Sequence, residues 1–452
     1  MHRSLKQRLE VIGICCAVIV IAMIFSMINN AIPTIKVDLS ASMTQVVWVM
    51  NIFGIVGCST LVTFGRLADI FGRKKLFLFG QTCQIISLVG SGLSHSIHWI
   101  IFFQIFSGMG NGILLTVSQA MLTENFGEEN RNKALGLWSS MIGLSLAIGP
   151  VLSGFLITHF GWRWIFFAPL PVVAVGMVLV FFFARESRNT LDTPKLDLLG
   201  MGLLIVTISA FTLGIIEGHH FSTLTTTFIF IISGVALLLL LLVERKAKEP
   251  IIREDLFTNR RFVLASLCSC SFIFIIWASF FILPLFYQHI VGYSALQTGL
   301  ILMCITIPLA SLSAPVAKLY QHMPVKVILS IGFMFILVAT MCELFFNAHT
   351  PWWFFCVSSA FIGIAFAMIL GPATTAAVST LTKERAGIAT GTFMTIQEVG
   401  GNLGLAITTA VVDDHLHFSD GFHHGMWVLV IVSALGLLSA LLIKSGRLEQ
   451  QP

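Results

Sequence analysis

The stretch GRLADIFGRKK, residues 65–75, carries five charged side chains in a chain that is only 10% charged and 56% hydrophobic. A mean hydropathy of +0.93 over 452 residues far exceeds what the core of a water-soluble domain needs. The lipid bilayer is therefore the predicted solvent of this chain. The charged stretch is then expected to join two membrane-spanning segments.

The predicted fold is an all-α polytopic membrane protein with 14 transmembrane helices. A spanning helix needs roughly 20 mainly apolar residues, whereas the strands of a transmembrane barrel are shorter and alternate apolar with polar residues. The apolar stretches that meet the helical criterion are residues 11–32, 44–64, 76–94, 98–122, 134–158, 165–184, 197–217, 224–244, 262–287, 297–319, 325–347, 352–380, 387–413 and 425–444.

The basic residues predict the orientation of these spans, because positive charge is retained on the cytoplasmic side of a membrane. With the N-terminus inside, every one of the 26 lysines and arginines except Lys36 and Arg163 falls on the cytoplasmic side. An even number of spans then places both termini in the cytoplasm. The net charge of +5 follows from this topology and does not indicate a nucleic-acid partner. The first apolar run lacks a small-residue cleavage pattern and is expected to be retained as an anchor.

The charged stretch resembles the G-x-L-a-D-r-x-G-r-k signature of the major facilitator superfamily. Gly65 allows close helix approach, Gly72 allows a sharp turn, and Asp69 can accept hydrogen bonds from an arginine or a helix N-terminus. Such a charge lock would hold two halves of the protein together on the cytoplasmic side in one state and release them in another. The alternative is a hairpin whose basic residues only set the topology. The predicted lock consists of Gly65, Arg66, Asp69, Gly72, Arg73 and Lys74.

An internal repeat supports this resemblance. The stretch AKLYQHMPVK, residues 317–326, aligns without gaps with residues 65–74, so that Gln321 matches Asp69 and Pro324 matches Gly72. The repeat predicts a major facilitator fold of two six-helix halves plus two inserted helices. The predicted boundaries are 1–190 for the N-terminal half, 191–250 for the inserted segment and 251–452 for the C-terminal half.

A second pattern lies in the fifth predicted span. It resembles the g-x8-g-x3-GP-x2-GG pattern of antiporters in the same superfamily, through Gly136, Ser145, Gly149, Pro150 and Gly154. Small residues let helices pack closely, and a proline bends a helix. Packing alone is the alternative explanation of the small residues.

Two further stretches, GWRWIF at 161–166 and FYQHIVGYSALQTGL at 286–300, look like the fourteen-helix drug:proton antiporter branch (EmrB/QacA type). This resemblance implies proton-coupled export of hydrophobic or amphipathic small molecules, multidrug-type efflux by alternating access. It also implies a multi-pass protein of the bacterial cytoplasmic (inner) membrane. The implied partners are a small-molecule substrate, protons and the lipid bilayer, and the sequence identifies no adaptor protein.

The sequence departs from this branch at positions often linked to proton and cation handling. In the branch pattern D-x-T-x-x-N-x-A-x-P the Asp position holds Ile24, and in R-x-x-Q-G-x-G the Arg position holds Gln104. Two alternatives stay open, and these departures favour the first. One is a major facilitator importer or uniporter of a metabolite or siderophore, and the other is a non-transport membrane receptor.

The coupling candidates are carboxylates within the spans. No G-x-x-x-x-G-K-[ST] loop occurs in the sequence, so an ATP-driven pump is not expected, and neither an enzyme activity nor a cofactor is predicted. Glu398 lies near the middle of a predicted span, where a lipid-facing charge costs roughly 2.5–3.5 kcal/mol, so it is expected to face a cavity and bind a proton. Glu217 and Glu343, nearer the outer ends of their spans, are the next candidates. The alternative for Glu398 is a neutral side chain hydrogen-bonded between helices.

The remaining polar residues in the spans are candidates for lining a substrate cavity, although each is individually more typical of a helix–helix hydrogen bond. They are Asn29, Asn51, Gln104, Asn111, Trp277 and Gln288. The outer histidines His415, His417, His423 and His424 leave transition-metal binding open, but no metal site is assigned. The nine cysteines are expected to be packing residues.

The topology predicts that residues 245–261 and both termini face the cytoplasm. Cysteines introduced at Lys248 and Gln450 should be inaccessible to a membrane-impermeant thiol reagent in intact cells, whereas a cysteine at Lys36 should react. Labelling of Lys248→Cys or Gln450→Cys from outside the cell would contradict the orientation.

Overall fold

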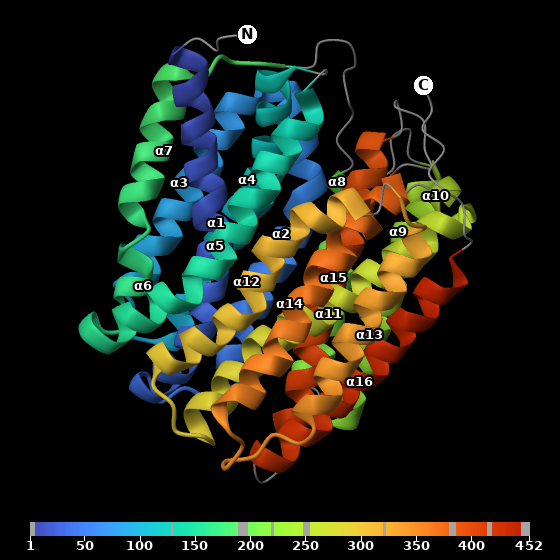
Figure 1. The fold of residues 1–452 in the computed structure, drawn as a ribbon. Helices are drawn as coiled ribbons and strands as arrows, with labels where there is room; N and C mark the ends of the chain where they lie inside the picture. Colours follow the sequence, from blue (N-terminus) through green and yellow to red (C-terminus); the bar gives the residue numbers. More distant parts are fainter. Residues whose placement is uncertain are drawn as a thin grey trace. The chain divides into compact units, whose positions relative to one another are not determined.

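The architecture is a set of α-helices, seen in a computed structural model that describes residues 5–127, 130–188, 198–217, 221–246, 254–319, 322–378, 386–413 and 418–443. These residues contain no β-strand, which confirms the all-α class (Figure 1). The helices are α1 (Leu5–Asp38), α2 (Met43–Phe71), α3 (Arg73–Gly92), α4 (Ile97–Phe126), α5 (Arg131–Phe160), α6 (Trp164–Phe167), α7 (Leu170–Phe183), α8 (Leu198–Ile216), α9 (Thr223–Lys246), α10 (Glu254–Thr258), α11 (Arg260–His289), α12 (Ala295–Leu319), α13 (Val325–Glu343), α14 (Trp352–Val378), α15 (Ala386–Asp413) and α16 (Phe418–Leu442).

Eleven of the helical segments in the described residues are long and apolar enough to cross a membrane, one of them combining α6 and α7. A shorter apolar run, Gly202–Ile216, lies in α8. α3 and α15 are not among the eleven, and their polar residues include Gln81 and Gln84 on α3 and Glu398 on α15. A multi-pass membrane protein is therefore confirmed, while the number fourteen stays a prediction.

Local sequence signals explain where several helices begin and end. Ser42 caps α2 in a reciprocal arrangement with Gln45, in which each side chain bonds the other residue's backbone N–H. Asn259 accepts hydrogen bonds from the first free N–H groups of α11. Gly127 and Gly161, both with positive φ, follow the last residues of α4 and α5.

The contacts divide the described residues into two compact units, with unit 1 ending at Ile205 and unit 2 beginning at Val206. In unit 1, α4 packs against α2 and α3, and α1 packs against α5 and α7. In unit 2, α14 packs against α12 and α13, and α11 packs against α15 and α16. The boundary falls inside α8, and the predicted division into two halves and an inserted pair stays a prediction.

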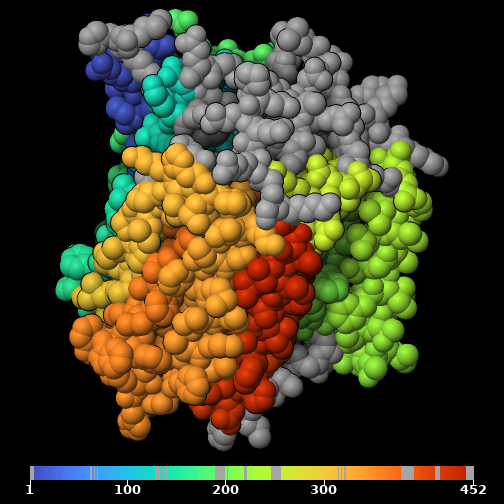
Figure 2. Space-filling view, turned by 45° about the vertical axis from the view of Figure 1, so that its right-hand side comes forward, coloured from blue at the N-terminus to red at the C-terminus, as the bar shows by residue number. Residues whose placement is uncertain are grey.

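Each unit has its own buried core. The core of unit 1 is mainly aliphatic and joins α1, α3 and α4 through residues such as Ile14 and Val117, with the Phe77 ring among them. Unit 2 instead buries many aromatic rings, including those of Phe272, Phe286 and Phe355. On one face of unit 2, the side chains of α13 (orange) and α16 (red) lie side by side (Figure 2).

Close helix packing in unit 2 depends on a glycine of α14. A Cβ atom added to Gly363 would overlap the backbone carbonyl of Ile305 on α12, and a backbone neighbour cannot move aside as a flexible side chain can. Gly371, eight residues further along the same helix, has no such neighbour within 4 Å. The two glycines therefore form a matched pair.

We expect Gly363→Ala to lower the free energy of unfolding by about 1–3 kcal/mol, because the extra methyl forces α12 and α14 apart. Gly371→Ala should be neutral or stabilising by about 0.5–1 kcal/mol, since alanine favours helix. Thermal unfolding of the purified proteins in detergent measures both effects. Equal melting temperatures for the two variants would show that the contact at Ile305 is not tight.

Candidate functional site

The stretch 65–75 is mostly helical rather than a loop. α2 continues to Phe71 and α3 begins at Arg73, so Gly72 alone makes the turn, with φ of 112°. Such a φ strains any residue with a side chain, and the Glu186 carboxylate occupies the place where a Cβ would lie. Both helices therefore extend beyond the apolar spans 44–64 and 76–94 expected from the sequence, because backbone hydrogen bonding continues past the apolar residues.

Arg73 takes part in a network of charged and polar groups. Its guanidinium lies 3.0 Å from the Glu124 carboxylate at the end of α4, and the Ser187 hydroxyl donates to the same carboxylate oxygen at 2.6 Å. The Arg73 backbone N–H donates to the Ser187 carbonyl at 3.0 Å. The α2–α3 turn is thus tied to α4 and to the segment after α7. Because Glu124 is about half exposed, the ion pair itself is expected to contribute roughly 1 kcal/mol or less.

Lys74 connects the same turn to the segment after α7. Its ammonium donates to the Ala184 carbonyl at 2.9 Å and lies 5.7 Å from the centre of the Phe181 ring, and its backbone N–H donates to Glu186 at 3.1 Å. Gly65 lies against Thr116 of α4. All these partners belong to unit 1. The side chains of Arg66 and Asp69 lie outside the described residues, so the predicted lock between halves stays a prediction.

The pattern on α5 lies where this helix meets α1. Gly149 faces Ser26 and the Met23 carbonyl, and a Cβ at this position would overlap the Ser26 hydroxyl and make a tight contact with the Met23 carbonyl. The amide of Asn30 donates to the Pro150 carbonyl at 3.0 Å and to the Ser153 hydroxyl at 2.9 Å, and all of these groups are buried. The small residues and the proline therefore form an interhelical contact fixed by a polar side chain.

Asn30 was not among the residues predicted from the sequence. Its neighbour Asn29, which was predicted, donates to the Phe25 carbonyl of its own helix at 2.8 Å. The other members of the α5 pattern differ in their surroundings. A Cβ added to Gly136 would meet no neighbour within 4 Å, whereas Ser145 is buried and bonds the Met141 carbonyl, and Gly154 is buried.

The three coupling candidates lie in unit 2 on different segments. Glu398 is half-buried in α15, where the neighbouring Gln397 donates to Ser269 of α11 and Asn402 donates to the Glu398 carbonyl at 2.8 Å. Glu343 is the last residue of α13 and is fully buried. Glu217 follows α8 and is partly exposed. The exposure of the three carboxyl side chains therefore ranges from fully buried to partly exposed.

The cavity candidates are buried or partly buried in both units. Asn51 donates to the Val47 carbonyl of its own helix at 3.2 Å, and Asn111 lies beside Gly57 of α2. Both polar atoms of the buried Gln104 amide lack a hydrogen-bond partner among the described residues. In unit 2, Trp277 packs against Gly401 of α15, and Gln288 is partly buried near the end of α11. Whether these residues share one cavity stays a prediction.

A second ionic contact lies at the opposite end of α1. Asp38 accepts a hydrogen bond from the Trp162 indole at 2.7 Å and pairs with Arg163 at 3.3 Å. Arg163 also stacks on the Trp162 ring and donates to the Ser94 carbonyl. Arg163 is conspicuous in the sequence as one of two basic residues on the predicted outer side, and this contact gives it a partner.

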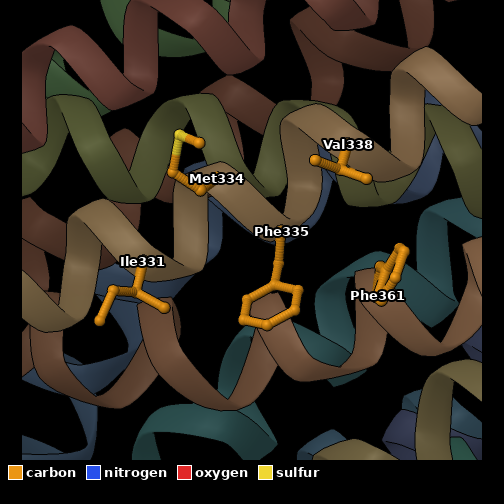
Figure 3. A pocket seen from close by; sticks show the side chains of 5 residues that line it. All are labelled: Ile331, Met334, Phe335, Val338 and Phe361. Carbon is orange, nitrogen blue, oxygen red and sulfur yellow. The ribbon is translucent and has the colours of Figure 1, made fainter.

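A shallow groove of about 240 Å³ on unit 2 is lined only by apolar side chains of α13 and α14 (Figure 3). None of the candidate residues lines it, so it offers no chemistry for coupling. Within the part of the chain that the structure describes, no three His, Cys, Asp or Glu residues are grouped to hold a metal ion. His415, His417 and Asp414 lie outside that part.

The sequence profile of the Major Facilitator Superfamily matches residues 14–405 and again residues 265–450. The multidrug export protein EmrB of Escherichia coli (strain K12) is 29% identical over 393 residues, which cover 85% of this chain and 76% of that protein. The methylenomycin A resistance protein of Streptomyces coelicolor is 26% identical over 444 residues, covering 97% of this chain and 91% of that protein.

Solved structures resemble the fold at low sequence identity. A D-xylose-proton symporter has a TM-score of 0.69 and 14% identity, with 97% of this chain and 98% of that chain covered. A POT family transporter in complex with 5-aminolevulinic acid has a TM-score of 0.72 and 14% identity, with 96% of each chain covered. These likenesses establish the fold alone.

The bridge from Asn30 to α5 predicts a stability effect. Asn30→Ala leaves buried acceptors on α5 without this donor, and we expect it to lower the free energy of unfolding by about 0.6–2 kcal/mol. The control is Thr158→Val, which removes a hydrogen bond within α5 only. Thermal unfolding in detergent compares the two. A melting temperature for Asn30→Ala no lower than that of Thr158→Val would contradict a bridging role.

Proposed function

The chain belongs to the major facilitator superfamily, and we propose that it is a proton-coupled exporter of hydrophobic or amphipathic small molecules. Membership indicates a transporter rather than an enzyme. The observation that carries export is the similarity to proteins named for multidrug export or drug resistance, which extends over most of the chain. The α5 pattern, packed against α1 at Gly149 and Pro150, supports the same proposal.

A proton gradient supplies enough free energy for this task. One proton moving down 100 mV provides roughly 2.3 kcal/mol, which sustains about a fifty-fold gradient of substrate. One carboxylate that exchanges its proton with alternate sides of the membrane therefore suffices. The proposed location is the bacterial cytoplasmic (inner) membrane, with both termini in the cytoplasm.

Glu398 is the proposed coupling residue. Its half-buried position lets its side chain be reached in one state and shielded in another. It sits between Gln397, which bonds Ser269, and Gly401, which packs on Trp277, so α15 holds it at a fixed place beside α11. A carboxylate in low dielectric resists ionisation. Changing its exposure therefore changes its affinity for a proton.

The charged stretch at the α2–α3 turn is proposed to control the conformational change. The contacts of Arg73 and Lys74 tie the α2–α3 turn to α4 and to the segment after α7. Asp69, one turn of helix before Gly72, is proposed to contact the other half in one state of the cycle. Because the turn is tied to several helices, the loss of the Asp69 contact would change the position of all of them.

A second candidate is an importer or uniporter of a metabolite or siderophore. Ile24 and Gln104 favour it, because they replace the acidic and basic residues that the antiporter branch carries at these positions. The direction of proton-driven flux separates the two functions. Outward pumping of substrate against inward proton flow supports the exporter, and co-directional flux supports the importer.

We expect Glu398→Gln to abolish uphill, pH-driven transport while leaving substrate exchange intact, because glutamine keeps the shape but cannot bind and release a proton. Accumulation driven by an imposed pH gradient and counterflow without a gradient are measured on the same proteoliposomes. The control combines Glu398→Gln with Gln397→Glu, which moves the carboxylate by one residue to the side of α15 that faces α11. This double variant should not regain pumping.

If Glu398→Gln still concentrates substrate at the wild-type rate, Glu398 serves only as a neutral hydrogen-bonding group. Coupling would then have to reside at Glu217 or Glu343. If the wild type itself shows no pH-driven flux, proton coupling fails altogether.

A further inference from the structure

Glu343 has an unusual place for an acidic residue. It ends α13, its side chain has no exposed surface, and α13 packs there against α14 and α16. The Ser358 hydroxyl of α14 approaches one carboxylate oxygen, Oε1, at 3.3 Å and the Ala339 carbonyl at 3.2 Å. The other oxygen, Oε2, is buried without a hydrogen-bond partner among the described residues. One oxygen is therefore hydrogen-bonded and the other has room for a proton.

A second buried hydroxyl lies beside this carboxyl group. Tyr287 of α11 is fully buried, and its phenol is close to Ser359 of α14 and to Glu343. The four helices α11, α13, α14 and α16 are neighbours within unit 2 (Figure 1). The polar groups of Glu343, Tyr287, Ser358 and Ser359 thus lie near one another inside one unit, and we call them the Glu343 centre.

Aromatic rings enclose the Glu343 centre. The Tyr287 ring lies 4.9 Å from that of Phe355, which in turn lies 4.7 Å from Phe346. Phe286 stacks on Phe422 of α16 at 4.2 Å. All five rings are fully buried. Bulk water is therefore kept from the carboxyl group in this state.

The charges around the Glu343 centre do not neutralise a carboxylate. Its titratable neighbours are the phenol of Tyr287 and the thiols of Cys304 on α12, Cys342 on α13 and Cys356 on α14, none of which is cationic. At this end of α16, His423 and His424 each place Nδ1 against a carbonyl of their own helix, and Asp420 is exposed. Among the described residues no lysine or arginine pairs with Glu343. An ionised Glu343 would be a buried, uncompensated charge, which is strongly destabilising.

We propose that the Glu343 centre is a second proton-binding site, in which Glu343 holds a proton on Oε2 while the aromatic enclosure is closed. The proton leaves for water only when the enclosure opens, and the carboxylate is then hydrated. The occupancy of the site is inferred from the burial of Glu343, its unpartnered Oε2 and the absence of a cationic partner among the described residues, whereas its part in transport rests on the proposed function. If both parts hold, a transport cycle exchanges a proton here in addition to the one at Glu398.

Infrared difference spectroscopy tests the occupancy without using transport. Spectra of the full-length wild type and of Glu343→Gln in lipid vesicles at neutral pH are subtracted. We expect the wild type to show a carboxylic-acid C=O band that the variant lacks. If the variant instead lacks a carboxylate band that the wild type shows, Glu343 is ionised and the proposal is wrong.

A second variant covers the case in which Glu343→Gln does not fold. Ser358→Ala removes the hydroxyl next to Oε1 and should shift the acid band to higher frequency. Ser311→Ala on α12, whose hydroxyl bonds carbonyls of its own helix, should leave the band in place. An acid band that Ser358→Ala does not move belongs to another group, and the assignment to Glu343 is then wrong.

The part in transport is tested by the pH profile of uphill flux. Glu343→Gln should accumulate less substrate in response to a pH gradient, with a changed pH profile, but keep counterflow, because the centre is then permanently neutral while Glu398 still exchanges its proton. If uphill flux by Glu343→Gln depends on pH as in the wild type, the Glu343 centre takes no part in transport. If the wild type shows the carboxylic-acid band but no uphill transport, the proton site is supported and the proposed function is rejected.

Discussion

A polar group that leaves water inside a bilayer is costly unless it finds a partner within the protein, and the arrangement of this chain depends on that constraint. Where the helices are apolar, hydroxyl and amide side chains mostly bond carbonyls of their own helix, as Asn51 and Thr60 do. Where two helices must be fixed, a side chain reaches across, as Asn30 does from α1 to α5. At the α2–α3 turn, Arg73 and Lys74 meet partners at one end of unit 1.

The same constraint separates the two buried acids. Glu398 lies on a half-buried face of α15, next to the polar residues Gln397 and Asn402. Glu343 lies behind aromatic rings, and its polar neighbours are hydroxyl groups. In the proposed mechanism the first exchanges protons readily and the second only with a change of conformation. Ile24 stands where the antiporter branch carries an aspartate. In the proposed mechanism, the carboxylates that couple transport to protons lie instead in the C-terminal part of the chain.

The sequence predicted the helices well because a long apolar run of this kind has few other structures available in a bilayer. Most predicted spans agree with the helices to within a few residues. The exceptions occur where polar residues continue a helix beyond its apolar part, as before Phe71 in α2 and from Phe418 in α16. Hydropathy cannot detect these extensions, because hydrogen bonding of the backbone and not apolarity maintains them.

The contacts within the candidate site were predicted less well, since they join residues far apart in the sequence. Nothing near Arg73 indicates that Glu124 and Ser187 are its partners. Asn29 matches the family pattern and Asn30 does not, yet the face of α1 that meets α5 decides which amide makes the bridge. Glu343 could be recognised as a carboxylate in a span. Its hydrogen-bond partner Ser358 and its neighbour Tyr287 could be found only once the helices of unit 2 were placed together.

Proton countertransport is the central claim, and the movement of protons caused by substrate tests it most directly. Proteoliposomes containing the wild-type chain and a pH-sensitive dye in the lumen receive an inward gradient of a transported compound, with no pH gradient imposed. Countertransport predicts that the lumen becomes more alkaline, because each substrate molecule that enters drives protons out. Acidification of the lumen would indicate co-transport, and uptake of the compound without any pH change would indicate a uniporter; either result would contradict the account.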